Sequence, residues 1–360
     1  MLENVADDDY RGSTKDKSTK VDHVSHTQVG RMIDKTGALL HAQLHGPDAT
    51  WKSTHNPSPL LVLEADGSRY RTNEADKHVQ KKKPGRVQAR KTDADDESEL
   101  SREERDRGWR ENKIGIIYRA LHGKTVDGEY QPPQELLKTY VATTGKLSDF
   151  ERDLYVEAIR RGIHQAANVV CVSDNGHGLP SMWVRLFELL RLELNRVTDF
   201  YHCSERLNAC SKILTVPKES NRYWQRLRGL LWRGKAEKVL ETLRQDAPGL
   251  APRPARLADL DDLPNAKTVW SHIFYFERYK DTMNYPEYRE KGWPMGSGSV
   301  ESACGQFGER VKHNRMRWTR KTADALHGIK AAILSQDQRW ENLWPPPVSV
   351  LAVPSSFLYN

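Results

Sequence analysis

Residues 168–176 read NVVCVSDNG, and this stretch does most to decide the fold expected for the chain. An apolar run that stops at a carboxylate and a turn is typical of a buried strand, which here ends at Asp174. Residues 59–67, PLLVLEADG, have the same design and stop at Asp66. Residues 68–71 could then return as the second strand of a hairpin. Two buried strands that each end in an acid predict a sheet that carries carboxylates at one edge.

Further strands and helices are expected around these two segments. The patterns predict strands at residues 113–118 and 196–201. A helix is expected from about Pro180, because apolar residues follow it at every third or fourth position. Other helices are predicted at residues 25–44, 148–165, 223–244 and 268–280, and from about Val300. This order predicts an α/β fold, a mixed sheet flanked by helices and interrupted by an all-helical insertion.

The same patterns divide the chain into five parts. These are a partial N-terminal helical region (1–50), the first part of the core (51–204), the helical insertion (205–289), a return to the core with its last helix (290–335), and an extended tail (336–360). Within the core, residues 72–110 carry a basic block, an acidic block and few apolar residues. Such a segment cannot bury enough apolar surface to fold, so a mobile loop is expected. The core of the insertion is expected to contain Trp224, Trp232, Trp270 and Trp293.

Composition sets only weak limits on function. The 360 residues contain 56 Lys and Arg against 49 Asp and Glu, a formal net charge of +7. This mild excess fits a polyanion-binding protein, but also many proteins without such a partner. The cysteines lack the clustering that a zinc site needs, so we expect reduced thiols in a cytosolic protein. The start is polar and acidic, and no run approaches the ~20 apolar residues of a membrane span, so neither a signal peptide nor membrane attachment is expected.

Asp66, Asp174 and Glu301 are the candidate functional acids. Phosphoryl transfer on DNA needs cations that activate the attacking oxygen and stabilise the leaving one. Mg²⁺ prefers hard oxygen ligands, which three convergent carboxylates supply. Glu301 lies in the first turn of its predicted helix, beside an apolar stripe that should bury against the sheet. That stripe consists of Val300, Cys304, Phe307 and Val311.

Each of these acids also has a plainer interpretation. Asp-Gly after a strand is ordinary turn chemistry, which would make Asp66 a turn residue, and the same holds for Asp174 before Asn175 and Gly176. A glutamate such as Glu301 in a first helical turn commonly just offsets the helix dipole. Composition and spacing therefore leave the metal site as one of two hypotheses.

Residues 285–318 carry a more specific signal. They read YPEYREKGWPMGSGSVESACGQFGERVKHNRMRW. This stretch resembles the C-terminal catalytic block of the ISKra-type family of bacterial insertion-sequence transposases, in which a GSG-x-VES segment supplies the last acid of a DDE triad and a basic helix ends in MRW. VLEADGSRYR resembles the block with the first acid, and NVVCVSDNG with VTDFYHCSERL resembles the block with the second. The resemblance covers residues 25–344, thinly through 72–110.

The resemblance implies an RNase H-like fold and a transposase that uses Mg²⁺ or Mn²⁺. Its catalytic triad and metal ligands would be Asp66, Asp174 and Glu301. The Asp199-x-x-His202 element resembles the [C/D]xxH signature of Mutator-related transposases, which lies beside the active site. His202 is expected to orient a phosphate or a member of the triad. The alternative is a buried histidine that is hydrogen-bonded to backbone.

The sequence departs from the family pattern in two places. The second acid is usually followed by Gly-Ala, whereas Asn175 and Gly176 follow it here. The chain is also expected to be short at its front, where family members carry more DNA-binding sequence. Residues 25–44 resemble the last helix of that region.

The basic residues after Glu301 are the candidate DNA contacts, because cations beside the metal site would hold phosphates. They are Lys312, His313, Arg315, Arg317, Arg320 and Lys321. A solvated basic face is the alternative. The expected reaction frees a 3′-OH at each element end and then joins it to target DNA. A homo-oligomer on DNA, in the cytoplasm at the nucleoid, is expected. Competing hypotheses are a silent DNA-binding descendant of a transposase and an RNase H-fold nuclease.

Overall fold

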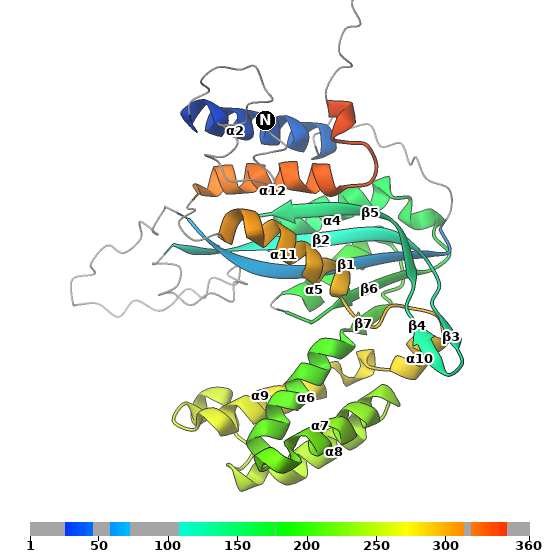
Figure 1. Ribbon diagram of the computed structural model, residues 1–360, viewed down its shortest axis with the longest axis vertical. Coiled ribbons are helices and arrows are strands. Elements are labelled where there is room, and N and C mark those ends of the chain that lie inside the picture. Colours follow the sequence, from blue (N-terminus) through cyan, green and yellow to red (C-terminus); the bar gives the residue numbers. More distant parts are fainter. Residues whose placement is uncertain (1–25, 46–57, 73–107, 177, 313–317, 344–360) are drawn as a thin grey trace, which may run out of the picture.

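Five strands form the centre of the protein, whose computed structural model describes residues 26–45, 58–72, 108–176, 178–312 and 318–343 (Figure 1). Their order in the sheet is β5-β2-β1-β6-β7. The strands are β1 (Leu60–Arg71), β2 (Trp109–Leu121), β5 (Gln134–Thr143), β6 (Val169–Ser173) and β7 (Arg196–Thr198). Neighbours among β1, β2 and β5 are antiparallel, whereas β6 runs parallel to β1 and β7 parallel to β6. The expected mixed sheet in an α/β protein is confirmed.

Helices cover both faces of the sheet, which explains why its central strands are apolar on both sides. On one face, α4 (Leu147–Arg160) and α5 (Leu179–Leu190) pack on residues such as Leu63 of β1. On the other face, α11 (Gly298–Lys312) lies across β1 and β2 (Figure 1). Val62 faces this second side, because successive side chains of a strand alternate between the faces.

A group of helices follows β7 and lies below the sheet in Figure 1. It consists of α6 (Phe200–Leu214), α7 (Pro217–Trp232), α8 (Ala236–Asp246), α9 (Pro264–Tyr279) and α10 (Tyr285–Glu290), with the short turns η2 (Ala247–Gly249), η3 (Leu257–Leu260) and η4 (Lys280–Thr282). Their apolar core is continuous with the sheet face beneath α11, since one cluster of buried side chains contains residues of both. The four expected tryptophans either belong to this cluster or pack against it.

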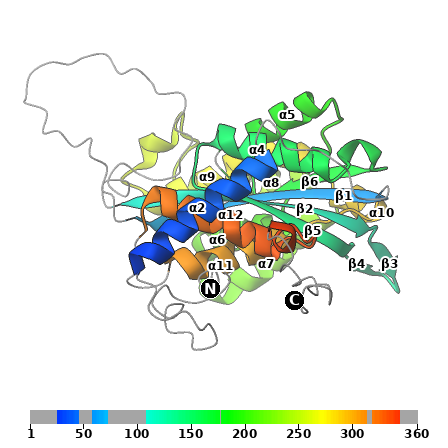
Figure 2. The same ribbon diagram turned by 90° about the horizontal axis from the view of Figure 1, so that it is seen from above.

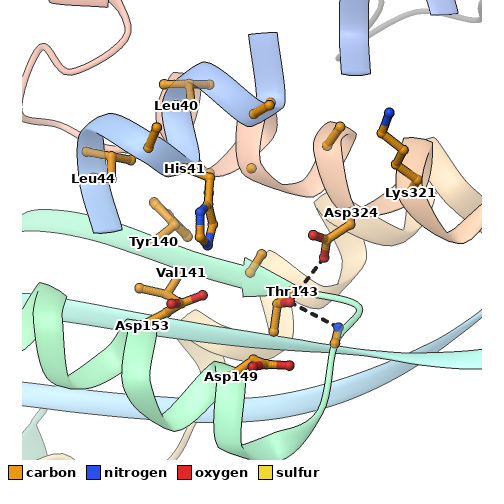
Figure 3. A pocket seen from close by; sticks show the side chains of 18 of the residues that line it. Leu40, His41, Leu44, Tyr140, Val141, Thr143, Asp149, Asp153, Lys321 and Asp324 are labelled. Atoms are coloured by element: carbon orange, nitrogen blue, oxygen red, sulfur yellow. Dashed lines mark hydrogen bonds between the residues drawn. The ribbon is translucent and has the colours of Figure 1, made fainter. Parts of the chain in front are cut away.

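A further layer lies over β5. There α12 (Arg320–Leu334) packs on the strand, and α2 (His26–His45) packs on α12 (Figures 1 and 2). A cavity of about 480 Å³ opens between these elements and α4 (Figure 3). Beside it, Asp324 Oδ1 accepts hydrogen bonds from the Thr143 hydroxyl at 3.1 Å and from the Thr144 backbone N–H at 2.7 Å. These bonds attach α12 to the end of β5.

The expectation for the end of β1 was wrong. The strand does not stop at Asp66 but continues to Arg71, and it pairs with β2 along its whole length. Residues 68–71 therefore extend β1 instead of returning as a hairpin. Two features keep Asp66 and Gly67 in an extended strand conformation. The ladder with β2 pairs its backbone groups, and Tyr70 is buried in the cluster that α2 and α12 form.

Several other expected bounds also differ. The single helix predicted at 223–244 is two helices, because the chain turns at Gly234, which has a φ of +70°. The strand predicted at 196–201 ends at Thr198, where Asp199 begins α6. The region 290–335 contains two helices, α11 and α12, instead of one.

Some elements were not expected at all. They are β5, the hairpin of β3 (Lys124–Val126) and β4 (Glu129–Gln131), and the short turn η5 (Glu341–Leu343). The helix predicted at 148–165 ends at Arg160 as α4 and is followed by the short turn η1 (Ile163–Gln165). The predicted loop 72–110, the N-terminal region and the tail fall largely outside the described residues.

Two composition-based expectations can be compared with the fold. The four cysteines, Cys171, Cys203, Cys210 and Cys304, are buried and free. Within the described part of the chain, no helix has both the length and the apolar character needed to cross a bilayer.

Candidate active site

Asp66 lies on β1, and Asp174 directly follows the neighbouring parallel strand β6. In the register of β1 and β6, Glu64 is opposite Val172, and each acid follows two residues after this last pair. Each carboxylate accepts a hydrogen bond from the backbone just after it, at 2.6 Å for Asp66 and 2.8 Å for Asp174. Both residues are half-buried. The sheet thus brings together two acids that are far apart in the sequence.

The third acid, Glu301, reaches this region on α11. The apolar stripe beside it is buried against the sheet, as expected. The thiol of Cys304, one turn further along the helix, is hydrogen-bonded to the carboxylate of Asp66. Glu301 itself keeps 45% of its side chain exposed. Cys304 of α11 therefore contacts Asp66, whereas the Glu301 carboxylate on the same helix stays accessible to solvent.

Asp199 and His202 link β7 to Glu301. Asp199 is fully buried, and its Oδ1 caps α6 by accepting the backbone N–H groups of Tyr201 and His202, at 2.6 and 3.0 Å. The Nδ1 atom of His202 lies 3.5 Å from Asp199 Oδ2 and 3.4 Å from Glu301 Oε1. These contacts with two carboxylates favour a role beside the acids over that of a histidine bound to backbone.

The glycine-rich turn before α11 is attached to the same aspartate. The backbone N–H of Ser297 donates to Asp199 Oδ2 at 2.6 Å, and the Ser297 hydroxyl lies 3.3 Å from Glu301 Oε1. Gly296 has no space for a side chain, because a Cβ there would lie 2.6 Å from the ring of Tyr201. The GSG part of the motif therefore packs the turn closely onto the start of α6.

The charges of these groups act on one another. Burial raises the pKa of Asp66 to about 6, the negative charge of Asp174 adds to the rise, and the charge of His202 opposes it. The interaction with Asp199 is the largest cause that raises the pKa of His202 to about 9, the charges of Asp174 and Glu301 contribute to the rise, and partial burial opposes it. All three candidate acids therefore interact electrostatically with the imidazolium of His202.

A cavity of about 190 Å³ opens beside two of the acids. Asp66 and Asp174 line it together with Asn112 and Lys113 of β2, whereas Glu301 is not among the residues that line it. The two aspartates thus reach open space at the edge of the sheet. Lys113 places a cation next to this space.

Two sets of donors could hold a cation. Asp66, Asp174 and Glu301 supply carboxylate oxygens, the hard ligands that Mg²⁺ and Mn²⁺ accept. Asp199, His202 and Glu301 offer one atom each within 4.8 Å of one another. The oxygens of Asp199 already accept hydrogen bonds, however, and the raised pKa of His202 keeps its ring protonated near neutral pH. A metal would have to displace that proton. Asp66, Asp174 and Glu301 offer the harder ligands, but among the described residues the two aspartates do not belong to the group whose ligand atoms lie within 4.8 Å of one another.

Sequence reasoning missed Glu64, which holds α11 in place. Only 1% of Glu64 is exposed. Its Oε1 accepts the Tyr118 hydroxyl at 2.8 Å, and its Oε2 accepts the backbone N–H of Val300 at 2.9 Å, in the first turn of α11. Burial raises the pKa of Glu64 to about 8, although both hydrogen bonds oppose the rise. The available signal was a carboxylate inside the apolar run LLVLEA.

The buried carboxyl of Glu64 should make stability fall as the pH rises. Its ordinary pKa is 4.5 and its folded pKa about 8, so between these values the folded protein binds a proton that the unfolded chain has lost. The Glu64 contribution to the free energy of unfolding therefore falls by about 1.4 kcal/mol per pH unit across this window. Gln can replace the neutral carboxyl, because its amide donates to the Tyr118 oxygen and its carbonyl accepts from Val300. Urea unfolding of Glu64→Gln should lack this decline.

The matched control is Glu241→Gln, which alters an exposed glutamate of α8. Its stability should follow that of the unmodified protein at every pH. A Glu64→Gln curve parallel to the unmodified one would show that Glu64 is already ionised at neutral pH.

The candidate DNA contacts are only partly described. His313, Arg315 and Arg317 lie outside the described residues. Lys312 is the last residue of α11, but its side chain is not described. Arg320 and Lys321 are exposed and begin the separate helix α12, where Lys321 Nζ lies 3.3 Å from Asp34 of α2. A role for these residues in binding DNA stays a prediction.

Comparisons with known proteins add no family to this description. No family model matches the chain, and a search of the curated proteins gives no match.

Proposed function

We propose that this chain is a DDE-type transposase that cleaves and joins DNA with Asp66, Asp174 and Glu301. One observation carries the proposal. Asp66 and Asp174 line one cavity, and Glu301 Oε1 lies 3.4 Å from His202 Nδ1, whose positive charge also acts on both aspartates. Such a concentration of negative charge is costly unless a cation offsets it, and the acids lie at the edge of a sheet that fixes their backbones.

We propose further that the sheet is of the RNase H-like type. Support comes from its topology, in which three antiparallel strands precede two parallel ones. The first acid, Asp66, lies on β1, and the second, Asp174, directly follows the neighbouring strand β6. The third, Glu301, lies on α11, which crosses the sheet at β1 and β2.

The carboxylates of Asp66, Asp174 and Glu301 fit Mg²⁺ or Mn²⁺ because their negative charges would be offset by a divalent cation. Burial and the neighbouring Asp174 both oppose ionisation of Asp66, and a divalent cation held by the two aspartates and Glu301 would remove that opposition. When bound, the cation would activate the attacking oxygen and stabilise the leaving one. The chain itself would position the ligands. The parallel strands β1 and β6 place the two aspartates, and Glu64 accepts a hydrogen bond from the first turn of α11, the helix of Glu301.

His202 has a separate role in this proposal. The carboxylate of Asp199, 3.5 Å from its Nδ1, keeps the imidazole cationic, and Asp199 in turn is fixed by the backbone of α6 and by Ser297. A fixed cation beside the carboxylates can hold a phosphate oxygen of DNA and can orient Glu301. The partner we propose is therefore DNA, bound at transposon ends and target by a homo-oligomer.

The test is an assay of the purified chain on double-stranded DNA with Mg²⁺ or Mn²⁺. DNA that flanks this reading frame in its source genome serves as the substrate, and EDTA serves as the control. We expect strand cleavage that exposes a 3′-OH, followed by joined products, and no product with EDTA. Nicked DNA that is never joined would favour the nuclease hypothesis. Binding without any cleavage would favour the silent DNA-binding hypothesis.

A further inference from the structure

The loop that carries Asp174 has an uncommon backbone. Asn175 has a φ of +59°, in the left-handed region that, apart from glycine, asparagine adopts more readily than most residues. The Asp174 carboxylate also accepts the backbone N–H of Gly176 at 2.8 Å. The direction of this carboxylate therefore depends on the path of the next two residues, which neighbouring parts of the protein must hold.

The helical insertion supplies much of that hold through Tyr275 of α9. The Tyr275 hydroxyl donates to the backbone carbonyl of Asp174 at 2.9 Å and accepts the side-chain amide of Asn175 at 3.3 Å. The same amide also donates to Thr198 Oγ1 at 2.8 Å. One hydroxyl thus contacts both Asp174 and Asn175, from a helix about a hundred positions further along the chain.

Tyr275 is itself held firmly. The guanidinium of Arg206, on α6, lies 4.0 Å from the centre of its ring, and burial raises the pKa of the hydroxyl. The hydroxyl therefore stays protonated and remains a donor to Asp174. Tyr275 thus packs against α6, the helix that carries His202 and that Asp199 caps.

We propose that Tyr275 is a positioning residue through which the helical insertion sets the orientation of Asp174 for metal binding. This inference rests on the proposed function. Tyr275 contacts the backbone carbonyl of Asp174 and not its carboxylate, so its effect on the carboxylate is transmitted through the backbone of the loop. Without its hydroxyl the Asp174 peptide loses its hydrogen bond to α9, and the left-handed Asn175 loses one of its two amide contacts. The carboxylate would then sample other directions.

The substitution Tyr275→Phe removes only the hydroxyl and should leave the fold intact. Its matched control is Tyr223→Phe, which removes the hydroxyl that donates to Asp246 elsewhere in the insertion. Two readouts are made on the full chain without DNA. Hydrogen–deuterium exchange reports on the peptide that spans residues 172–180, and calorimetric titration with Mn²⁺ alone reports on the metal affinity.

We expect faster exchange of this peptide and about tenfold weaker Mn²⁺ binding in Tyr275→Phe, as for groups that orient metal ligands indirectly. The Tyr223→Phe control should match the unmodified protein in both. Faster exchange with unchanged Mn²⁺ affinity would reduce Tyr275 to a merely structural residue and overturn the inference, as would no change in either readout. Absence of Mn²⁺ binding to the unmodified protein, or equal binding to Asp174→Asn, would instead overturn the proposed function and this inference with it.

Discussion

Replacing Asp174 by Asn should abolish DNA cleavage while DNA binding persists. The substitution removes one negative oxygen ligand from the proposed metal site, and hard cations depend on such ligands. Asn retains a side-chain carbonyl, which can still accept the Gly176 backbone N–H, so the loop should keep its path. We expect a loss of about a hundred- to a thousandfold in the cleavage rate, as for other electrostatic groups that act directly on the reacting atoms.

Binding and cleavage should separate in this variant. Affinity for DNA comes mainly from cations that contact phosphates, and Asp174→Asn removes none of these. A gel-shift titration gives the affinity, and a single-turnover assay gives the cleavage rate. The matched control is Asp262→Asn, an exposed aspartate of the helical insertion. Cleavage by Asp174→Asn within a few-fold of the control would refute its assignment as a metal ligand.

The second large effect concerns stability. Glu157 of α4 is completely buried and is surrounded by arginines. Arg339 Nη2 lies 2.6 Å and Arg161 Nε 3.2 Å from its Oε1, while Arg160 Nη1 lies 3.6 Å from Oε2. Burial opposes ionisation, but the three arginines outweigh it and lower the pKa of Glu157. Asp337 accepts from Arg161 and Arg339 and completes the network.

Glu157→Ala should therefore destabilise the fold by about 3–5 kcal/mol, the cost of leaving buried charges without a partner. Arg161 and Arg339 would remain buried with Asp337 as their shared anion. Urea unfolding followed by circular dichroism measures the change. Glu237→Ala is the control, because Glu237 is exposed yet also contacts two cations, Arg244 and Lys280. Its unfolding midpoint should not move, and an equal loss in the two variants would argue against a special role for the buried network.

The sequence was informative where one local pattern determines an element. The apolar stripe next to Glu301 predicted which side of α11 is buried, and the helix from Pro180 was found in its expected place. The strand ending at Asp174 was also predicted correctly. In each case, packing follows directly from the spacing of apolar residues along a single segment.

Other features depend on contacts between distant segments, and local patterns could not reveal them. The Asp66-Gly67 pair predicts a turn locally, but pairing with β2 keeps it inside a strand. The ion pair of Glu157 and Arg339 joins residues that are 182 positions apart in the sequence. The contact of Tyr275 with Asp174 depends on how the insertion folds back onto the sheet. The helices and strands could largely be predicted from local patterns, but the contacts between residues far apart in the sequence could not.

The most direct test of the account is a crystal structure of the protein with Mn²⁺, recorded at a wavelength where manganese scatters anomalously. The account predicts an anomalous peak bound by carboxylate oxygens of Asp66 and Asp174, with Glu301 completing the protein ligands. A peak held by Asp199, His202 and Glu301 without either Asp66 or Asp174, or no peak near these acids, would contradict it.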